Sequence, residues 1–324
     1  MSKFVKRWVR PFFSSLQRIR GRRLSSLASS SAGLSKGGGG ESGGGEIHVP
    51  VLIVGAGPVG LVLSLFLTKL GIKCAVIEKS IAFSQHPQAH FINNRSMELF
   101  CKLDGLADDI QRLQPPLDLW RKFVYCTSLS GTILGSVDHM QPQDFEKLVS
   151  PISVAHFSQY KLTRLLLKKL ENLGFHVCTP NGLGVKHDMA FEKKILMGHE
   201  CISINPLAQG VKVGTSFLKD GEVLERNICC KILIGSDGSR STVRKLMDIE
   251  MKGERDLQKL VSVHFLSRDL GQYLMHGRPG MLFFIFNPDA IGVLVAHDLS
   301  QGEFVLQVVH ILLIKTITVL ASYL

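Results

Sequence analysis

Residues 49–80, VPVLIVGAGPVGLVLSLFLTKLGIKCAVIEKS, constrain the fold of this chain more than any other stretch. Its apolar residues 51–54 have the length and composition of a buried parallel strand. After a glycine-rich turn, an apolar segment from about Pro58 to Leu70 predicts a buried helix that Gly71 ends. Residues 73–77 then predict a second strand. A strand, a tight turn, a helix and a strand in this order predict an α/β fold with a parallel sheet.

The turn has the spacing G-x-G-x-x-G at Gly55, Gly57 and Gly60. In this spacing the first glycine allows the tight turn and the second lets the backbone approach a pyrophosphate. The third lets the following helix pack closely on the strand. Pro58 suits the first helical turn, where an amide hydrogen would have no partner. Since the positive end of the helix dipole would face the phosphates, the turn predicts a dinucleotide site.

An acidic residue follows the second strand at the position that a ribose needs. Glu78 lies 23 positions after Gly55, where a carboxylate reaches both hydroxyls of an adenosine ribose. A carboxylate there disfavours a 2′-phosphate, so the pattern predicts FAD or NAD in place of NADP. The expected contacts at this end of the site are Gly55, Ala56, Gly57, Pro58, Gly60, Glu78 and Lys79.

A second motif follows a short apolar strand at 231–234. Its sequence, GSDGSRSTVR, resembles the Asp-Gly motif of the flavin-dependent aromatic hydroxylases, the group of p-hydroxybenzoate, phenol and polyketide hydroxylases. The resemblance implies that the segment lies by the FAD and helps a nicotinamide cofactor to bind transiently. A glycine turn and a helix start with polar and cationic side chains also suit a phosphate-bearing ligand. The residues that match D-G-x-x-S-x-x-R are Asp237, Gly238, Ser241 and Arg244.

Two further segments resemble the same family. Residues 89–100, AHFINNRSMELF, are similar to its segment after the second strand, which implies that Arg95 lies near the flavin. Residues 158–173 predict a helix with one leucine-rich face. Its start, SQYKL, resembles the family's Q-x-x-L helix, which implies that Gln159 touches the flavin or its ribityl chain. Gln88 departs from the family, because it cannot supply the charge of the arginine that often contacts the pyrophosphate or the reduced nicotinamide there.

The resemblance implies a Rossmann-like FAD-binding domain of the hydroxylase type at 47–258, in which 47–115 and 156–250 enclose a β-rich insert. An incomplete antiparallel β substrate domain would follow at 259–308, and substrate residues would come from 121–137 as well. The implied reaction begins when NADH or NADPH reduces FAD. Dioxygen then adds at the flavin C4a position, and the hydroperoxide hydroxylates an aromatic or polyketide-like substrate. The flavin performs this chemistry, and the sequence assigns no catalytic residue and no metal site.

The resemblance covers residues 49–308 and ends before the apolar segment 309–324. The family's second flavin motif, Gly-Asp followed by Ala-Ala-His, has no counterpart after Gly238, so we expect a truncated or alternatively spliced product. Residues 304–324 approach the length of a membrane span. A lysine at mid-span costs roughly 2.5–3.5 kcal/mol on insertion scales, so Lys315 disfavours membrane anchoring, which stays an alternative.

The formal charge of +11 is concentrated at the N-terminus. Residues 1–40 hold nine of the 38 lysines and arginines and no Asp or Glu, which leaves 41–324 with only +2. This distribution argues against a nucleic-acid partner for the folded part. Residues 1–36, rich in Arg and Ser, are typical of an organellar transit peptide, with a disordered basic tail as the alternative. A Gly/Ser-rich linker follows at 37–46. Because Arg dominates the leader, we expect mitochondrial import, with a plastid as the alternative.

The seven cysteines show no metal-binding spacing and predict free thiols in a reducing compartment. The adjacent Cys229 and Cys230 lie in an apolar run, where two buried core positions are expected. Two other functions stay open. The first is a catalytically inactive FAD-binding fragment or isoform, and the second is an NAD-linked Rossmann dehydrogenase without flavin, against which the Asp237 motif counts. The oligomeric state and the substrate are not specified by the sequence.

Overall fold

The structure is a computed structural model that describes residues 47–140, 150–182, 191–254, 257, 260–288 and 291–309. All described residues belong to one compact unit, Gly45–Leu324. The expected transit peptide and the whole linker at 37–46 therefore lie outside the described residues, as does the apolar tail from His310 onward. Val309, expected to begin that tail, is still part of a strand.

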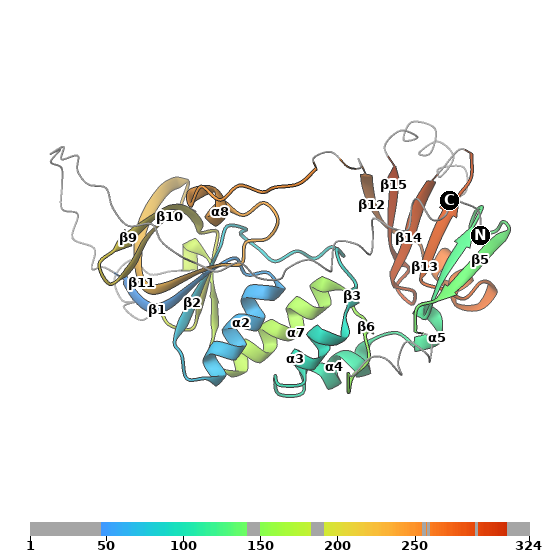
Figure 1. Cartoon of the computed structure of the whole chain (residues 1–324), viewed down its shortest axis with the longest axis horizontal. Helices are drawn as coiled ribbons and strands as arrows, with labels where there is room; N and C mark the ends of the chain where they lie inside the picture. Colours follow the sequence, from blue (N-terminus) through green and yellow to red (C-terminus); the bar gives the residue numbers. More distant parts are fainter. Residues whose placement is uncertain are drawn as a thin grey trace. The chain divides into compact units, whose positions relative to one another are not determined.

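A seven-stranded mixed sheet carries both glycine motifs (Figure 1). Its strand order is β7-β8-β2-β1-β11-β10-β9. The first five pair in parallel, and the last two continue as an antiparallel meander. The parallel strands are β1 (Ile47–Val54), β2 (Cys74–Glu78), β7 (His176–Cys178), β8 (Lys194–Met197) and β11 (Glu222–Gly235), and the meander adds β10 (Gly210–Lys219) and β9 (Glu200–Leu207).

Helices α2 (Pro58–Lys69) and α7 (Gln159–Asn172) pack together on one face of this sheet (Figure 1). The predicted helices are confirmed to within two residues at each end. Leu166 and Leu170 of α7 are fully buried, because its leucine face meets the sheet core. Helix α2 is less buried than its apolar sequence predicts, and Val59 is 70% exposed. Helices α3 (Asn94–Phe100) and α4 (Leu106–Leu113) complete the core on this face, and 3-10 helix η2 (Pro180–Gly182) follows β7.

A second sheet has the strand order β12-β15-β14-β13-β4-β5. The four strands within 260–309 pair antiparallel, which confirms the antiparallel sheet that the sequence predicted for 259–308. Strand β4 joins it in parallel beside β13, so the whole sheet is mixed. Strands β4 and β13 lie far apart in the sequence, and the long connection between them is what a parallel pair requires. The strands are β4 (Lys122–Cys126), β5 (Ile133–Asp138), β12 (Leu260–Leu266), β13 (Leu282–Phe286), β14 (Ile291–Asp298) and β15 (Glu303–Val309).

The second sheet has its own core, in which Phe283 and Phe304 are fully buried and Trp120 closes one side. The remaining described elements are short. These are α5 (Leu117–Trp120), α9 (Arg268–Gln272), the π-helical turn η3 (Tyr273–Gly277), α8 (Thr242–Leu246), and the two-stranded ribbon of β3 (Phe91–Ile92) and β6 (Ala155–His156).

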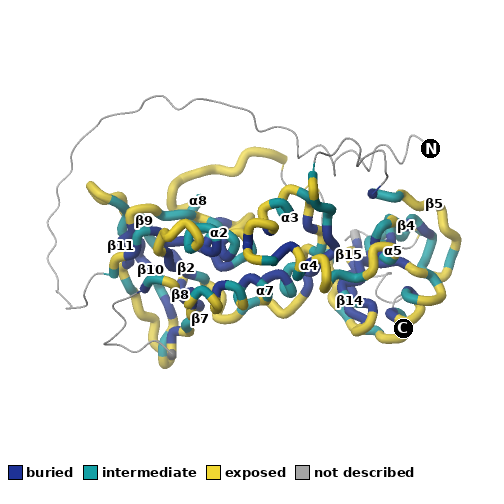
Figure 2. Tube along the Cα trace, turned by 90° about the horizontal axis from the view of Figure 1, so that it is seen from below, coloured by how far each residue is buried: buried dark blue, intermediate teal, exposed yellow. Residues whose placement is uncertain are grey.

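Burial follows this division into two cores, with buried positions along the central strands and exposed outer turns (Figure 2). Cys229 and Cys230 are each only 5% exposed, which confirms the expected core positions, and all seven cysteines are free thiols. Among the described residues, no helix is both long enough and apolar enough to cross a membrane.

Candidate functional site

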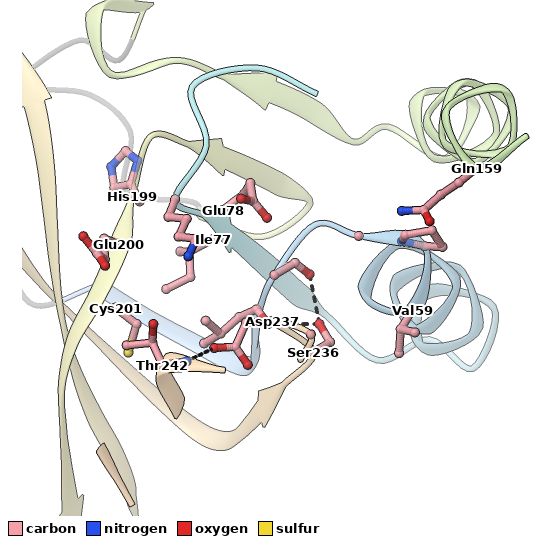
Figure 3. A pocket seen from close by; sticks show the side chains of 16 residues that line it. Val59, Ile77, Glu78, Gln159, His199, Glu200, Cys201, Ser236, Asp237 and Thr242 are labelled. Atoms are coloured by element: carbon pink, nitrogen blue, oxygen red, sulfur yellow. Dashed lines mark hydrogen bonds between the residues drawn. The ribbon is translucent and has the colours of Figure 1, made fainter. Parts of the chain in front are cut away.

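The two glycine motifs meet at the carboxyl ends of β1, β2 and β11 (Figure 3). The Ser236 amide donates to the carbonyl of Val54 at 2.7 Å, and its hydroxyl donates to the carbonyl of Gly55 at 2.9 Å. The Gly55 amide in turn donates to the carbonyl of Ile77 at 2.8 Å. The start of the second motif, about 180 residues further along the chain, therefore forms part of the first glycine turn.

Two of the three motif glycines are required by packing inside the protein. Gly55 has φ +104°, and a Cβ there would lie 2.7 Å from the Ser236 carbonyl oxygen. A Cβ on Gly60 would lie 2.0 Å from the Gly55 carbonyl oxygen and 2.7 Å from the Ser236 hydroxyl. These contacts extend the expected role of Gly60, because the helix packs on the second motif as well as on the strand.

Gly57 is different, because a Cβ there would meet no atom within 4 Å. Its φ of −70° and ψ of 177° are available to any residue, so backbone strain does not demand a glycine. The open space above Gly57 lies at the N-terminus of the 12-residue helix α2, where unpaired amides attract anions. Of the three glycines, Gly57 is therefore the one whose missing side chain leaves room for a ligand.

Glu78 is held over the glycine turn by two backbone amides. The Ala56 amide donates to Oε2 at 2.9 Å and the Ser80 amide donates to Oε1 at 2.9 Å. An ionised carboxylate has about four acceptor sites, so two hydroxyl donors can still be accommodated. Lys79, next along the chain, is exposed at the same rim.

A cavity of about 280 Å³ lies between these elements, and Figure 3 shows side chains from β1, β2, β9, α2, α7 and the second motif around it. A smaller cavity of about 130 Å³ adjoins it and shares Gly57, Pro58, Glu78 and Gln159 with it. The larger cavity is lined by Val54, Gly55, Gly57, Pro58, Val59, Ile77, Glu78, Lys79, Gln159, His199, Glu200, Cys201, Ser236, Asp237, Gly238 and Thr242.

Asp237 lines the cavity, but its carboxylate is occupied by the start of α8. Oδ1 accepts from the Ser241 hydroxyl at 2.6 Å, and Oδ2 accepts from the amides of Thr242 at 2.6 Å and Val243 at 3.1 Å. Burial acts to raise the pKa of Asp237, but these hydrogen bonds outweigh it and hold the pKa below the ordinary value. The carboxylate therefore stays ionised and orders the motif as a capping group.

Arg244 folds back on its own motif. Its guanidinium donates to the carbonyl oxygens of Gly238 and Ser239, and it does not line either cavity. Arg95 also lies outside both linings: it pairs with Glu98 at 2.9 Å, and its side chain is 77% exposed. The structure thus brings together ten of the twelve predicted cofactor-binding residues around the glycine turn and leaves these two arginines apart.

Gln159 lines both cavities and donates to the side-chain oxygen of Gln88 at 3.0 Å. Its backbone amide donates to the carbonyl of Ala89 at 2.8 Å, which fixes the first turn of α7 to the segment after β2. Two neutral amide side chains, Gln88 and Gln159, therefore lie where the aromatic hydroxylases that this chain resembles often have an arginine.

Sequence reasoning missed the side of the cavity formed by His199, Glu200 and Cys201. The His199 amide donates to the carbonyl of Glu78 at 2.9 Å, so the chain entering β9 lies beside the end of β2. Burial lowers the pKa of His199, and its Nδ1 bonds the carbonyl of Met197 at 2.9 Å. No local sequence signal marks these residues, because their place depends on the order of the strands in the sheet.

Comparisons with known proteins agree with this geometry. A family model described as "FAD binding domain" matches residues 48–311. The 2,4-dichlorophenol 6-monooxygenase of Delftia acidovorans is 30% identical over 248 residues, which cover 75% of this chain and 38% of that protein. The solved structure of the flavin-dependent monooxygenase PieE, in complex with FAD and substrate, superposes with a TM-score of 0.66 at 26% identity.

That superposition covers 81% of this chain and 43% of PieE. A ternary complex of aklavinone-11 hydroxylase with FAD and aklavinone has a TM-score of 0.64 at 26% identity, and covers 82% and 46% of the two chains. This chain therefore spans less than half the length of each of these three relatives. With a matching family model over most of its length and the motifs assembled around one cavity, the chain belongs to the FAD binding domain family.

Proposed function

We propose that this chain binds FAD across the two cavities and acts as the cofactor-binding part of an FAD-dependent aromatic hydroxylase. The main support for this proposal is that two motifs far apart in the sequence line one cavity at the N-terminus of α2. The names of the relatives, which include a dichlorophenol monooxygenase and an aklavinone hydroxylase, support this reaction class. NADH or NADPH would serve as the transient reductant, and dioxygen as the second substrate.

The residues around the cavity fit a dinucleotide. The open space over Gly57 and the free amides of α2 suit a pyrophosphate. Glu78, already oriented by the Ala56 amide, suits the ribose hydroxyls. Asp237 contributes by ordering the turn through its bonds to α8, and Gln159 borders the smaller cavity. When bound, the flavin supplies electron transfer and the activation of dioxygen, while the protein binds, orients and excludes water.

The substrate that we propose is a planar aromatic or polyketide-like molecule. One face of the second sheet carries aromatic rings, of which Tyr125 and Phe284 are half-buried and Phe286 is exposed. Tyr125 stacks on Phe284 at a centroid distance of 4.9 Å and lies near Phe286 at 6.3 Å. Such rings stack favourably on another aromatic ring. They support an aromatic substrate class without distinguishing its members.

The test is the spectrum of the purified full chain, with NADH and NADPH consumption followed in the same cuvette. We expect a protein-bound flavin after purification or after reconstitution, and saturable FAD binding. Tight NAD binding without FAD binding would instead support the NAD-linked dehydrogenase. Bound FAD without substrate-dependent NAD(P)H oxidation would support the catalytically inactive form.

We also propose that residues 1–36 direct the protein to the mitochondrion. The supporting observation is the concentration of basic residues, without any acidic residue, before the Gly/Ser-rich linker.

A further inference from the structure

Three side-chain contacts, made by Ser158, Tyr160 and Lys161, bond the start of α7 to the second sheet. The Ser158 hydroxyl bonds Nδ1 of His297 at 2.6 Å, immediately before the helix begins. The Tyr160 hydroxyl donates to Oε2 of Glu303 at 2.6 Å. Lys161 pairs with Asp298 at 2.8 Å. His297 and Asp298 end β14 and Glu303 begins β15, so each contact joins the start of α7 to one of these two strands.

The Ser158–His297 contact is buried, and the other two are partly buried, since the side chains of Lys161 and Asp298 are 29% and 24% exposed. Ser158 is 1% exposed, His297 3% and Glu303 9%. The ring of His156 lies beside them and bonds the Ala296 carbonyl through Nε2 at 3.0 Å. Because a buried polar group that loses its partner destabilises the folded state, a network of this kind keeps two elements in a fixed arrangement.

Glu303 connects three elements. Besides the Tyr160 hydroxyl on α7, its carboxylate contacts Nε2 of His264 on β12 at 3.3 Å. Burial, and then the bond to Glu303, raise the pKa of Tyr160 far above its ordinary value, so the hydroxyl stays protonated and remains a donor. The Tyr160 ring also lies under the Arg164 guanidinium at 5.2 Å, so removing the hydroxyl leaves the ring a packing partner.

The residue between these contacts faces the cofactor cavities. Gln159 lines both cavities and bonds Gln88, while Ser158 and Tyr160 on either side bond the second sheet. Tyr160 also lines the smaller cavity, and Tyr160→Phe keeps its ring there while removing the bond to Glu303. A helical turn is stiff, so a displacement of Ser158 or Tyr160 moves Gln159 with it. The second sheet itself contributes no residue to either cavity lining.

We propose that the first turn of α7 couples the FAD cavities to the second sheet, with Tyr160 and Glu303 as positioning residues that hold Gln159 in place. This inference rests on the proposed FAD binding. By linkage, the coupling acts in both directions. Bound FAD that orders Gln159 stabilises the hydrogen bonds between α7 and the second sheet, and those hydrogen bonds strengthen FAD binding by the same free energy, which a change at Glu303 would remove.

A double-mutant cycle on FAD binding tests the coupling. The full-length chain, Tyr160→Phe, Gln159→Ala and the double variant are titrated with FAD and followed by flavin fluorescence. We expect Tyr160→Phe to weaken FAD binding about three- to tenfold, as the loss of one charge-assisted hydrogen bond allows. In the Gln159→Ala background the same change should have little further effect, because the group being positioned is gone.

Glu303→Gln is the second variant, and Asp138→Asn is its matched control. Asp138 also pairs with a cation in the second sheet, Arg121 at 2.7 Å, but that pair does not contact α7. The control should bind FAD like the unchanged chain. Fully additive effects in the cycle, in variants that melt like the unchanged chain, would overturn the coupling.

Hydrogen exchange without FAD separates this inference from the proposed function. We expect Tyr160→Phe and Glu303→Gln to speed amide exchange in a peptide covering 157–163 and to leave a peptide covering α3 unchanged. If no variant binds FAD but exchange in 157–163 rises, FAD binding is wrong and the tie between α7 and the second sheet stands. If FAD binds and exchange in 157–163 does not change, the coupling is wrong.

Discussion

At the scale of single residues, the glycine motif combines two physical requirements. Gly55 and Gly60 leave room for neighbouring backbone and for Ser236, since a Cβ on either would lie within 2.8 Å of those atoms. Gly57 has no such neighbour and faces open space at the start of α2. The same sequence pattern therefore joins residues needed for folding to a residue kept small for a ligand.

Alanine at the two positions should separate these roles. Gly57→Ala should weaken FAD binding at least tenfold, because its methyl group would occupy the space over the helix N-terminus. It should change the free energy of unfolding by no more than about 1 kcal/mol. Gly60→Ala should lower that free energy by about 1–3 kcal/mol, because a Cβ would overlap the Gly55 carbonyl oxygen. Urea unfolding and FAD titration of both variants check this, and equal effects on stability would contradict it.

The two arginines expected at the cofactor show that the spacing of residues in a motif does not determine where a long side chain points. The D-G-x-x-S-x-x-R pattern predicted Arg244 as a cofactor-binding residue, but in the structure its guanidinium bonds Gly238 and Ser239 of its own loop. Arg95 bonds Glu98, one helical turn away. Their direct roles toward FAD stay predictions, because a long side chain has many rotamers and its local partners decide among them.

At the scale of elements, the ribbon of β3 and β6 and the end of β14 bring three histidine rings together. The His90 ring lies 4.9 Å from that of His156 and 5.4 Å from that of His297. Burial lowers the pKa of His156 and of His297 to about 3, and that of His90 to about 4. All three are therefore neutral where the two sheets are tied together.

The neutral histidines predict acid sensitivity. The unfolded chain binds protons at these rings below about pH 6.5, whereas the folded chain does so only near pH 3–4. Stability should therefore fall as the pH drops below 6.5, by about 1.4 kcal/mol per pH unit for each of His156 and His297. Urea unfolding at pH 7.5, 6.0 and 5.0 measures this, in a range above most carboxylate titration.

His156→Gln serves as the control, since its amide can still donate to the Ala296 carbonyl. As the pH falls, the free energy of unfolding of this variant should decrease less steeply than that of the unchanged chain. The difference in slope should correspond to about one proton fewer taken up on unfolding. An identical pH dependence in the two proteins would show that His156 does not resist protonation in the folded state.

At the scale of the whole molecule, the formal charge of +11 divides into a basic leader and a nearly neutral remainder. A fluorescent protein fused behind residues 1–46 should enter mitochondria, because a basic segment without acids is drawn by a negative-inside potential. Replacing Arg18, Arg20, Arg22 and Arg23 with Gln should leave the fusion in the cytosol. Import into plastids would support the alternative, and a diffuse signal from the unchanged leader would contradict targeting.

Much of the cofactor-binding half is readable from the sequence, because its signals are local. Glycine spacing, an apolar run and an acid after the second strand each restrict neighbouring residues, so β1, α2 and β2 were predicted to within one or two residues, apart from the early start of β1. The leucine period likewise predicts α7. The resemblance to the flavin-dependent hydroxylases implied that both motifs lie at one cofactor site, and the structure places them at one cavity, after the parallel strands β1 and β11.

Only the tertiary structure decided which distant segments lie together. It placed β4 in parallel beside β13, brought His199 and Cys201 to the cavity, and set Tyr160 against Glu303. Pairings of this kind depend on strand order and register across more than a hundred residues, and side-chain patterns within one strand do not specify them. The sequence by itself thus determined a dinucleotide turn and its helix, and the assembled sheets determined what surrounds that turn.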